Sequence, residues 1–172
     1  MRLLYSMLAL ALCVAGCGSD PGLGADVELW VEGDLSRVEG LKSVEFTIRD
    51  AHLQPAGFEI YPDHRITSEW RAMQLDTSRF EFLATGGLPM KIASLRVEDG
   101  DFDRVFLRPS LLGAETTEGQ SLVVKNVMEP IAAQFETGGG TVRILLKMIV
   151  LPTSRGDEDI SIFAQDTEVL LD

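Results

Sequence analysis

Apolar and polar residues alternate along most of the chain from about residue 26 onward. Residues 27–31 read V-E-L-W-V and residues 44–48 read V-E-F-T-I, with apolar side chains at every second position. Many of these apolar positions hold β-branched or aromatic residues, which favour extended backbone. A period of two is the repeat of a β-strand with one buried face. The pattern therefore predicts β-strands over most of the chain.

Turn-forming residues divide this alternation into short segments. The clearest breaks are Gly33-Asp34, Pro55-Ala56-Gly57, residues 85–89 (T-G-G-L-P) and the three glycines at 138–140. About eight short strands separated by such turns are typical of a β-sandwich or a barrel. We expect one all-β domain, a single antiparallel β-sandwich of about eight strands with a transthyretin-like or immunoglobulin-like arrangement.

The first 16 residues follow a different pattern. Arg2 is the only charged residue before Asp20, and an apolar stretch runs from Leu3 to Gly16. A membrane-spanning helix needs roughly 20 apolar residues, so this stretch is short for that role. A positive charge followed by a short apolar segment and small residues is typical of a secretory signal. We expect residues 1–16 to form a signal helix that is cleaved from the mature protein.

The end of this segment, Val14-Ala15-Gly16-Cys17, resembles the lipobox of bacterial lipoproteins. In that family an aliphatic residue and two small residues precede an invariant cysteine, which carries the lipid. The resemblance implies cleavage before Cys17, attachment of palmitate-type acyl chains there, and a lipid anchor in the cell envelope. Two or more acyl chains hold a protein firmly to a membrane. Gly18 follows the cysteine in place of an inner-membrane aspartate, so the resemblance favours the outer membrane in a Gram-negative host.

The mature chain then divides into two parts. Residues 17–25 contain three glycines, and we expect them to form a lipidated, flexible tether. Residues 26–172 form the expected β-sandwich domain. Of the two cysteines, Cys13 leaves with the signal and Cys17 carries the lipid, so a disulfide within the mature domain is excluded. Its stability then depends on a hydrophobic core.

Several short segments between about Val27 and Leu171 form a recognisable set. They are 44–48 running into His52-Leu53, then Trp70, Gln74-Leu75-Asp76, Gly86-Gly87-Leu88-Pro89, Leu95-Arg96-Val97 and Ala132-Ala133-Gln134-Phe135. In these segments the chain resembles the bacterial lipoprotein family known as domain of unknown function 4382. The resemblance implies a transthyretin-like or carbohydrate-binding-like β-sandwich and an envelope location, and it carries no catalytic signature.

The chain is acidic, with a formal net charge of −12 at pH 7, and it contains no run of Lys or Arg. Such a surface repels nucleic acid and anionic lipid headgroups. We therefore expect no nucleic-acid binding, and contact with a membrane would depend on the lipid alone. A protein of the envelope or a glycan remains as a partner.

Three features are candidate sites, each with an alternative reading. Asp99, Asp101 and Asp103 could converge on calcium, which prefers oxygen ligands, but they also suit a solvated hairpin in an acidic protein. Trp30 and Tyr61 could stack on a sugar or form an interaction hot spot, but burial under a loop or a second layer is the favoured interpretation of both. His52 and His64 are the only histidines, too few for a catalytic zinc site.

The sequence contains none of the common nucleophile, Walker or dinucleotide-binding motifs. We expect a non-enzymatic, ligand- or partner-binding domain with no cofactor other than its covalent lipid. Three alternatives predict different surfaces. A carbohydrate-binding module needs an exposed aromatic platform, a structural or assembly subunit needs an open edge strand and an apolar patch, and an envelope hydrolase needs a deep pocket holding a carboxylate of raised pKa.

Overall fold

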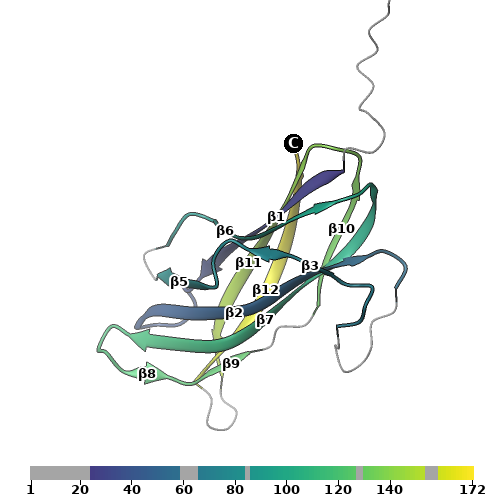
Figure 1. Cartoon of the computed structure of the whole chain (residues 1–172). Coiled ribbons are helices and arrows are strands. Elements are labelled where there is room, and N and C mark those ends of the chain that lie inside the picture. The colour runs from purple at the N-terminus through teal and green to yellow at the C-terminus, as the bar shows by residue number, and fades with distance from the viewer. Residues whose placement is uncertain (1–23, 59–65, 84–85, 127–129, 154–158) are drawn as a thin grey trace, which may run out of the picture.

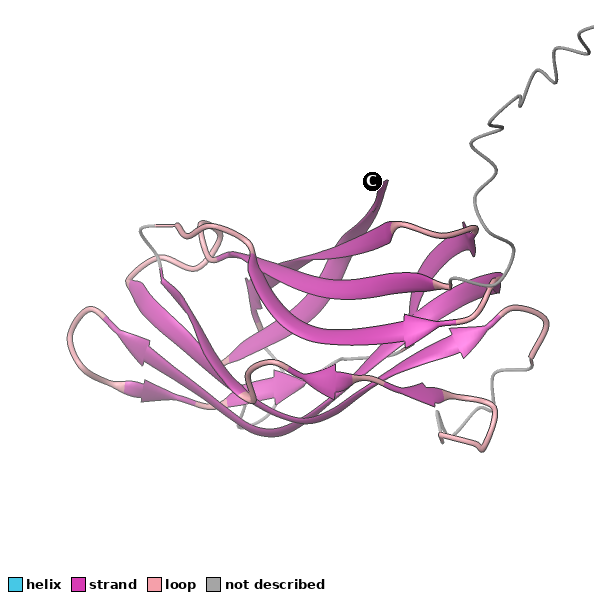
Figure 2. Ribbon diagram, turned by 45° about the horizontal axis from the view of Figure 1, so that its top comes forward, coloured by secondary structure: helices cyan, strands magenta, loops and turns pink. Residues whose placement is uncertain are grey.

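The computed structural model describes residues 24–58, 66–83, 86–126, 130–153 and 159–172. The signal, the lipobox with Cys17, and Tyr61 lie outside these residues. Within them the chain is all-β and contains no helix (Figure 2). The strands are β1 (Ala25–Asp34), β2 (Leu41–Pro55), β3 (Arg71–Ala72), β4 (Gln74–Leu75), β5 (Arg79–Leu83), β6 (Met90–Val97), β7 (Gly100–Thr116), β8 (Ser121–Leu122), β9 (Val124–Asn126), β10 (Ile131–Thr137), β11 (Thr141–Pro152) and β12 (Ile160–Leu171).

These strands form two sheets (Figure 1). The first sheet has the order β4-β6-β1-β11-β12-β9. The second has the order β10-β7-β2-β3, with β5 also paired to β2 and β8 to β7. The all-β prediction is confirmed, and the described residues contain more strands than expected because several are only two or three residues long.

The expectation of purely antiparallel pairing is wrong for the first sheet. There β1 runs parallel to β11, and β12 runs parallel to β9, whereas the second sheet is antiparallel throughout. Parallel neighbours need a long connection between them, and here most of the chain lies between β1 and β11. Alternation identifies a strand but carries no information on its neighbour, so this arrangement was not visible in the sequence.

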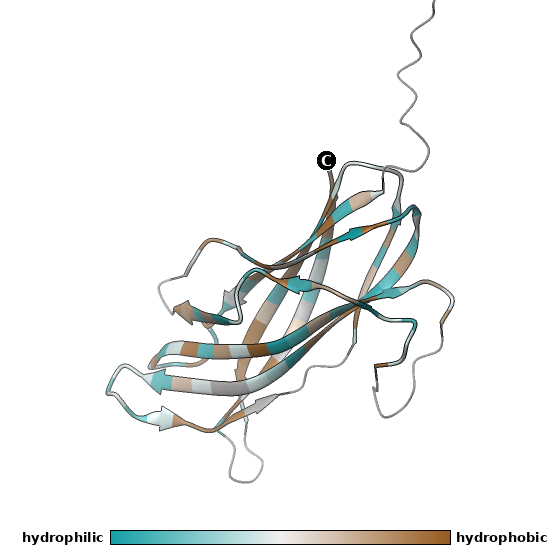
Figure 3. Cartoon of the chain, viewed as in Figure 1, coloured by the Kyte–Doolittle hydropathy of each residue, from teal (hydrophilic) through white to brown (hydrophobic). Residues whose placement is uncertain are grey.

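The predicted alternation itself is confirmed. In β1 the residues Val27, Leu29 and Val31 are buried while their neighbours are partly or fully exposed. Figure 3 shows the same apolar and polar alternation along β2. Most buried apolar side chains of both sheets belong to one hydrophobic cluster, which includes the large residues Phe46 and Leu146. Burial of apolar area at about 25 cal/mol per Å² is the main stabilising term of such a fold.

Aromatic side chains pack at two places in this core. Phe46, Phe80 and Phe82 form one group, with ring centroids 5.0–5.4 Å apart, and they join β2 to β5. Phe102 and Phe135 stack at 5.3 Å and join β7 to β10. Trp70 is buried as well, but it packs against Phe106 rather than in the main cluster.

The two ends of the domain are formed by different strands. The start of β1 and the C-terminal end of β12 lie at one end, and β5 and β8 lie toward the other (Figure 1). We call the first the β1-start end and the second the β5 end. In the part of the chain that the structure describes, no helix is long and apolar enough to cross a membrane.

Candidate functional site

The first candidate is a polar cluster on the outer face of the first sheet, around Trp30. Trp30 lies in β1 beside Lys91 of β6 and Leu145 of β11. Its indole Nε1 donates a hydrogen bond to Glu28 Oε2 at 3.0 Å. The guanidinium of Arg143 lies 5.3 Å from the centre of the Trp30 ring, within the range of a cation–π interaction.

Glu28 is the centre of this cluster. Lys91 Nζ donates to Glu28 Oε1 at 2.9 Å, and Arg143 Nε lies 3.5 Å from Oε2. The hydrogen bond from Lys91 is the main cause that lowers the pKa of Glu28 below its usual value, and partial burial opposes it. The same bond raises the pKa of Lys91. Glu28 is therefore held as a carboxylate, which is the opposite of what a general acid requires.

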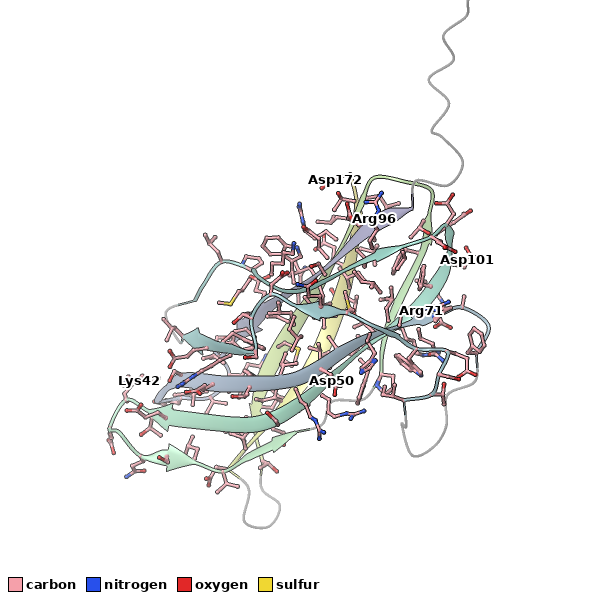
Figure 4. All side chains as sticks on the ribbon, viewed as in Figure 1. Lys42, Asp50, Arg71, Arg96, Asp101 and Asp172 are labelled. Carbon is pink, nitrogen blue, oxygen red and sulfur yellow. The ribbon has the colours of Figure 1, made fainter. Side chains whose placement is uncertain are left out.

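A polar cavity of about 380 Å³ adjoins this cluster toward the β1-start end. Its walls include Arg96, whose NH1 donates to both carboxylate oxygens of Asp26 at 2.9 Å, and the uncharged side chains of Gln74 and Ser94. Figure 4 shows Arg96 at this end, beside Asp172. Because acids and bases here are paired with one another, the cavity presents hydrogen-bond donors and acceptors with little unbalanced charge.

Trp30 is therefore neither a core residue nor an open aromatic platform. Its side chain is partly exposed on the outer face, but Arg143 covers part of its ring and Glu28 binds its only polar hydrogen. Tyr61, the other aromatic candidate, lies outside the described residues. The structure thus neither assembles nor tests an aromatic pair for stacking on a sugar.

The structure does not gather the acidic candidates around an ion. Asp99 precedes β7, whereas Asp101 and Asp103 lie within that extended strand. Asp101 and Asp99 line an open cleft of about 720 Å³ together with Arg71 and Trp70, and Figure 4 shows Arg71 and Asp101 on one flank. Asp103 instead lies 3.9 Å from Arg104. Among the residues that the structure describes, no group of three or more His, Cys, Asp or Glu could hold a metal ion.

His52 belongs to a partly buried polar row on β2 that the sequence did not reveal. His52 Nε2 lies 3.1 Å from Asp50 Oδ1, and Asp50 Oδ2 lies 3.5 Å from Arg108. Burial lowers the pKa of His52 below its usual value, and Asp50 opposes this shift. Gln54, two residues further along β2, is fully buried, and within the part of the chain that the structure describes neither its Oε1 nor His52 Nδ1 has a hydrogen-bond partner. His64 lies outside the described residues.

The second candidate is an apolar groove at the β5 end. It has a volume of about 230 Å³ and lies between β5 and the adjoining ends of β1 and β6. Val31 and Phe82 are its buried apolar residues, and Phe82 packs so closely on Gly33 that a Cβ there would overlap the ring. Its exposed apolar residues are Leu83, Leu88 and Met90, of which Leu88 is 93% exposed.

We call this surface, lined by Val31, Gly33, Glu81, Phe82, Leu83, Gly86, Gly87, Leu88 and Met90, the β5 groove. Sequence reasoning missed it. The available signal was Leu88, a large apolar residue inside the Gly-Gly-Leu-Pro turn, where polar residues are usual.

Comparison of the chain with protein-family models, with curated proteins and with solved structures finds no match.

Proposed function

We propose that this protein is a lipid-anchored lipoprotein of the cell envelope that binds another envelope protein and catalyses no reaction. The observation that carries this function is the β5 groove. Leu83, Leu88 and Met90 are large apolar side chains that are 46%, 93% and 40% exposed beside one groove. A gathering of exposed apolar residues is the usual mark of an interaction site.

The anchor in this proposal is Cys17, exposed after removal of residues 1–16, with the outer membrane as the location in a Gram-negative host. The lipobox resemblance supports it. The eight residues Gly18–Ala25 span at most roughly 25–30 Å when extended, which keeps the β1-start end near the bilayer. The β5 groove then lies at the end of the domain turned away from the anchor, where a protein partner has access (Figure 1).

The scaffold in this proposal is a β-sandwich of the transthyretin-like or carbohydrate-binding-like kind. One shared cluster of buried side chains from both sheets supports a face-to-face packing. A sandwich leaves its loops and edge strands for binding while the core holds them in place.

The proposal of a non-enzymatic role draws support from the carboxylates with a shifted pKa. Glu28, Asp34 and Glu69 all have a pKa lowered by hydrogen bonds. A hydrolase that uses a carboxylic acid needs the opposite shift.

Two measurements in intact cells test this function. Palmitate labelling should be lost in Cys17→Ala and retained in the matched control Cys13→Ala. A photo-reactive residue at position 88 should cross-link one envelope protein, whereas the same group at Leu171, which is 66% exposed at the β1-start end, should not. Labelling that persists in Cys17→Ala, or equal cross-linking from both positions, would contradict the proposal.

A second candidate function is carbohydrate binding at the polar cavity beside Trp30. The observation that favours it is the mixture of paired charges and neutral polar groups around about 380 Å³, next to a partly exposed indole. A glycan array with the purified protein identifies a bound sugar. A thermal-shift measurement then checks it in solution, because a bound ligand raises the midpoint of thermal unfolding by mass action. A hit that is lost in both Trp30→Ala and Gln74→Ala would support this function, and a flat array would exclude it. A thermal-shift measurement with added calcium tests whether Asp99, Asp101 and Asp103 bind this ion.

A further inference from the structure

We infer that the partner bound at the β5 groove is an extended, basic segment of another protein, which adds as a new strand to the free edge of β5. This inference rests on the proposed function and names the chemistry of the partner at that site. Three observations carry it: the open edge of β5, the apolar groove beside that edge, and the unbalanced charge of Glu81.

The edge of β5 is open. β5 pairs with β2 from Arg79 to Leu83, and no other strand of the described residues pairs with it. Such an edge presents backbone N–H and C=O groups to which an added strand can hydrogen-bond. Thr77 Oγ1 already bonds the N–H and C=O of Arg79, and the Leu83 C=O accepts from the Gly86 N–H, so the groups left for a new strand are centred on Glu81. Phe80 and Phe82 hold β5 in this position through their packing on Phe46, so the edge is a rigid template.

The groove gives this edge a preference for one kind of side chain. Phe80 and Phe82 of β5 point into the domain, and the buried floor of the β5 groove is formed by Val31 and Phe82. Glu81 and Leu83 alternate to the outer face of β5 and line only the rim of the groove. Side chains of an added strand also alternate between the two faces, so every second one would face the floor of the groove. Seating there would cover Leu88 and Met90, which favours apolar residues at these positions of the partner.

The outer face of the same edge favours a positive charge. Glu45 and Glu81 lie directly opposite one another on β2 and β5. Arg79 neutralises Glu45 through contacts of 2.8 and 2.9 Å. The Glu81 side chain is exposed and makes no hydrogen bond or ion pair in the described part of the chain. A Lys or Arg opposite Glu81 would supply the missing partner.

The same charge disfavours a second copy of this chain as the occupant. Two β5 strands paired antiparallel over their full length would place one Glu81 directly opposite the other. Like charges in directly opposed positions are destabilising, and the net charge of −12 adds a general repulsion. A different, basic segment meets no such penalty.

The test uses the full-length protein in detergent and a fluorescent octapeptide of alternating valine and lysine. The matched peptide carries glutamate in place of lysine. We expect the lysine peptide to bind the more tightly, and Glu81→Lys to weaken it roughly 2- to 10-fold while strengthening the glutamate peptide. Leu88→Ser should weaken both peptides, and the control Leu171→Ser should weaken neither.

Hydrogen exchange locates the bound peptide. Strand addition should slow exchange of backbone amides in residues 79–83 and leave β12 unchanged. Equal binding of the two peptides, no binding of either, or slowed exchange elsewhere would each overturn the inference. Sedimentation that shows a dimer dissociated by Leu88→Ser would instead identify a second copy as the occupant. These outcomes leave palmitate labelling and cross-linking from position 88 unchanged, so failure of this inference is distinguishable from failure of the proposed function.

Discussion

The polar cluster around Glu28 and the β5 groove are two surfaces of the domain that differ in how far their side chains are already paired. Around Glu28 each charge has an oppositely charged neighbour, since Lys91, Arg143 and the Trp30 indole all converge on one carboxylate. Among the described residues, one buried atom of this cluster, Arg143 Nε, has no hydrogen-bond partner. At the β5 groove, large apolar side chains remain in water and Glu81 has no partner among the described residues. A surface whose charges are already paired gains little from a partner, whereas the β5 groove gains apolar burial and a charge pair. The comparison therefore indicates that the β5 groove is the surface of the two that gains more free energy from binding a partner.

The largest expected effect is a loss of stability on substitution of Phe82, which forms the buried floor of the β5 groove. Phe82→Ala removes a buried ring that packs on Gly33, Phe46 and Phe80. We expect a loss of about 3 kcal/mol in the free energy of unfolding, measured by urea denaturation. A loss below about 1 kcal/mol would show that this ring is not part of the core.

The next effect tests whether the polar cluster is stabilising. Glu28→Gln leaves Lys91 and Arg143 without their shared carboxylate, and their side chains are 32% and 38% exposed. Solvent screening at this exposure limits the expected loss to about 1 kcal/mol. The matched control is Asp26→Asn, which breaks a pair whose two side chains are more than half exposed and should cost less. Equal losses in the two variants would contradict the ranking.

Stability measured as a function of pH tests His52, a partly buried residue outside the β5 groove. Burial lowers the pKa of His52, so the folded state favours its neutral form. The unfolded chain takes up a proton near pH 6.5, so stability should fall as the pH decreases from there toward the lower pKa of the folded state. His52→Gln should flatten this part of the denaturation profile. An unchanged slope in the variant would assign the pH dependence to other groups.

The smallest effect is expected at the rim of the groove. Leu88 is 93% exposed, so Leu88→Ser should change the free energy of unfolding by no more than about 0.5 kcal/mol. The same variant should reduce cross-linking and peptide binding. A substitution that leaves the fold intact while removing binding is the pattern expected of an interaction surface, and a large loss of stability would place Leu88 in the fold instead.

The sequence predicted what depends on neighbours along the chain and missed what depends on neighbours in space. Alternation in residues 27–31 and 44–48 was enough to predict strands and their buried faces. It also placed Trp30 on the outer face of β1, but the pairing of Trp30 with Glu28 and Arg143 requires the parallel alignment of β1 with β11. That alignment joins residues more than a hundred positions apart.

The candidate sites show the same division. The aspartates at 99, 101 and 103 are close in sequence, yet β7 begins at Gly100 and extends the backbone that an ion site would need to curl. The β5 groove combines Val31 and Gly33 of β1 with residues from 81–83 and 86–90, and their proximity depends on how the two sheets pack. Only Leu88, in its turn, carried a local signal.

The parallel pairing of β1 with β11 has a mechanical consequence. β1 is held on both edges, by β6 and by β11, and its register with β11 covers nine residue pairs from Asp26 to Asp34. A pull between a lipid anchor at the start of β1 and a partner at the β5 end would act along the strand. The load would then shear many hydrogen bonds at once instead of opening them one after another.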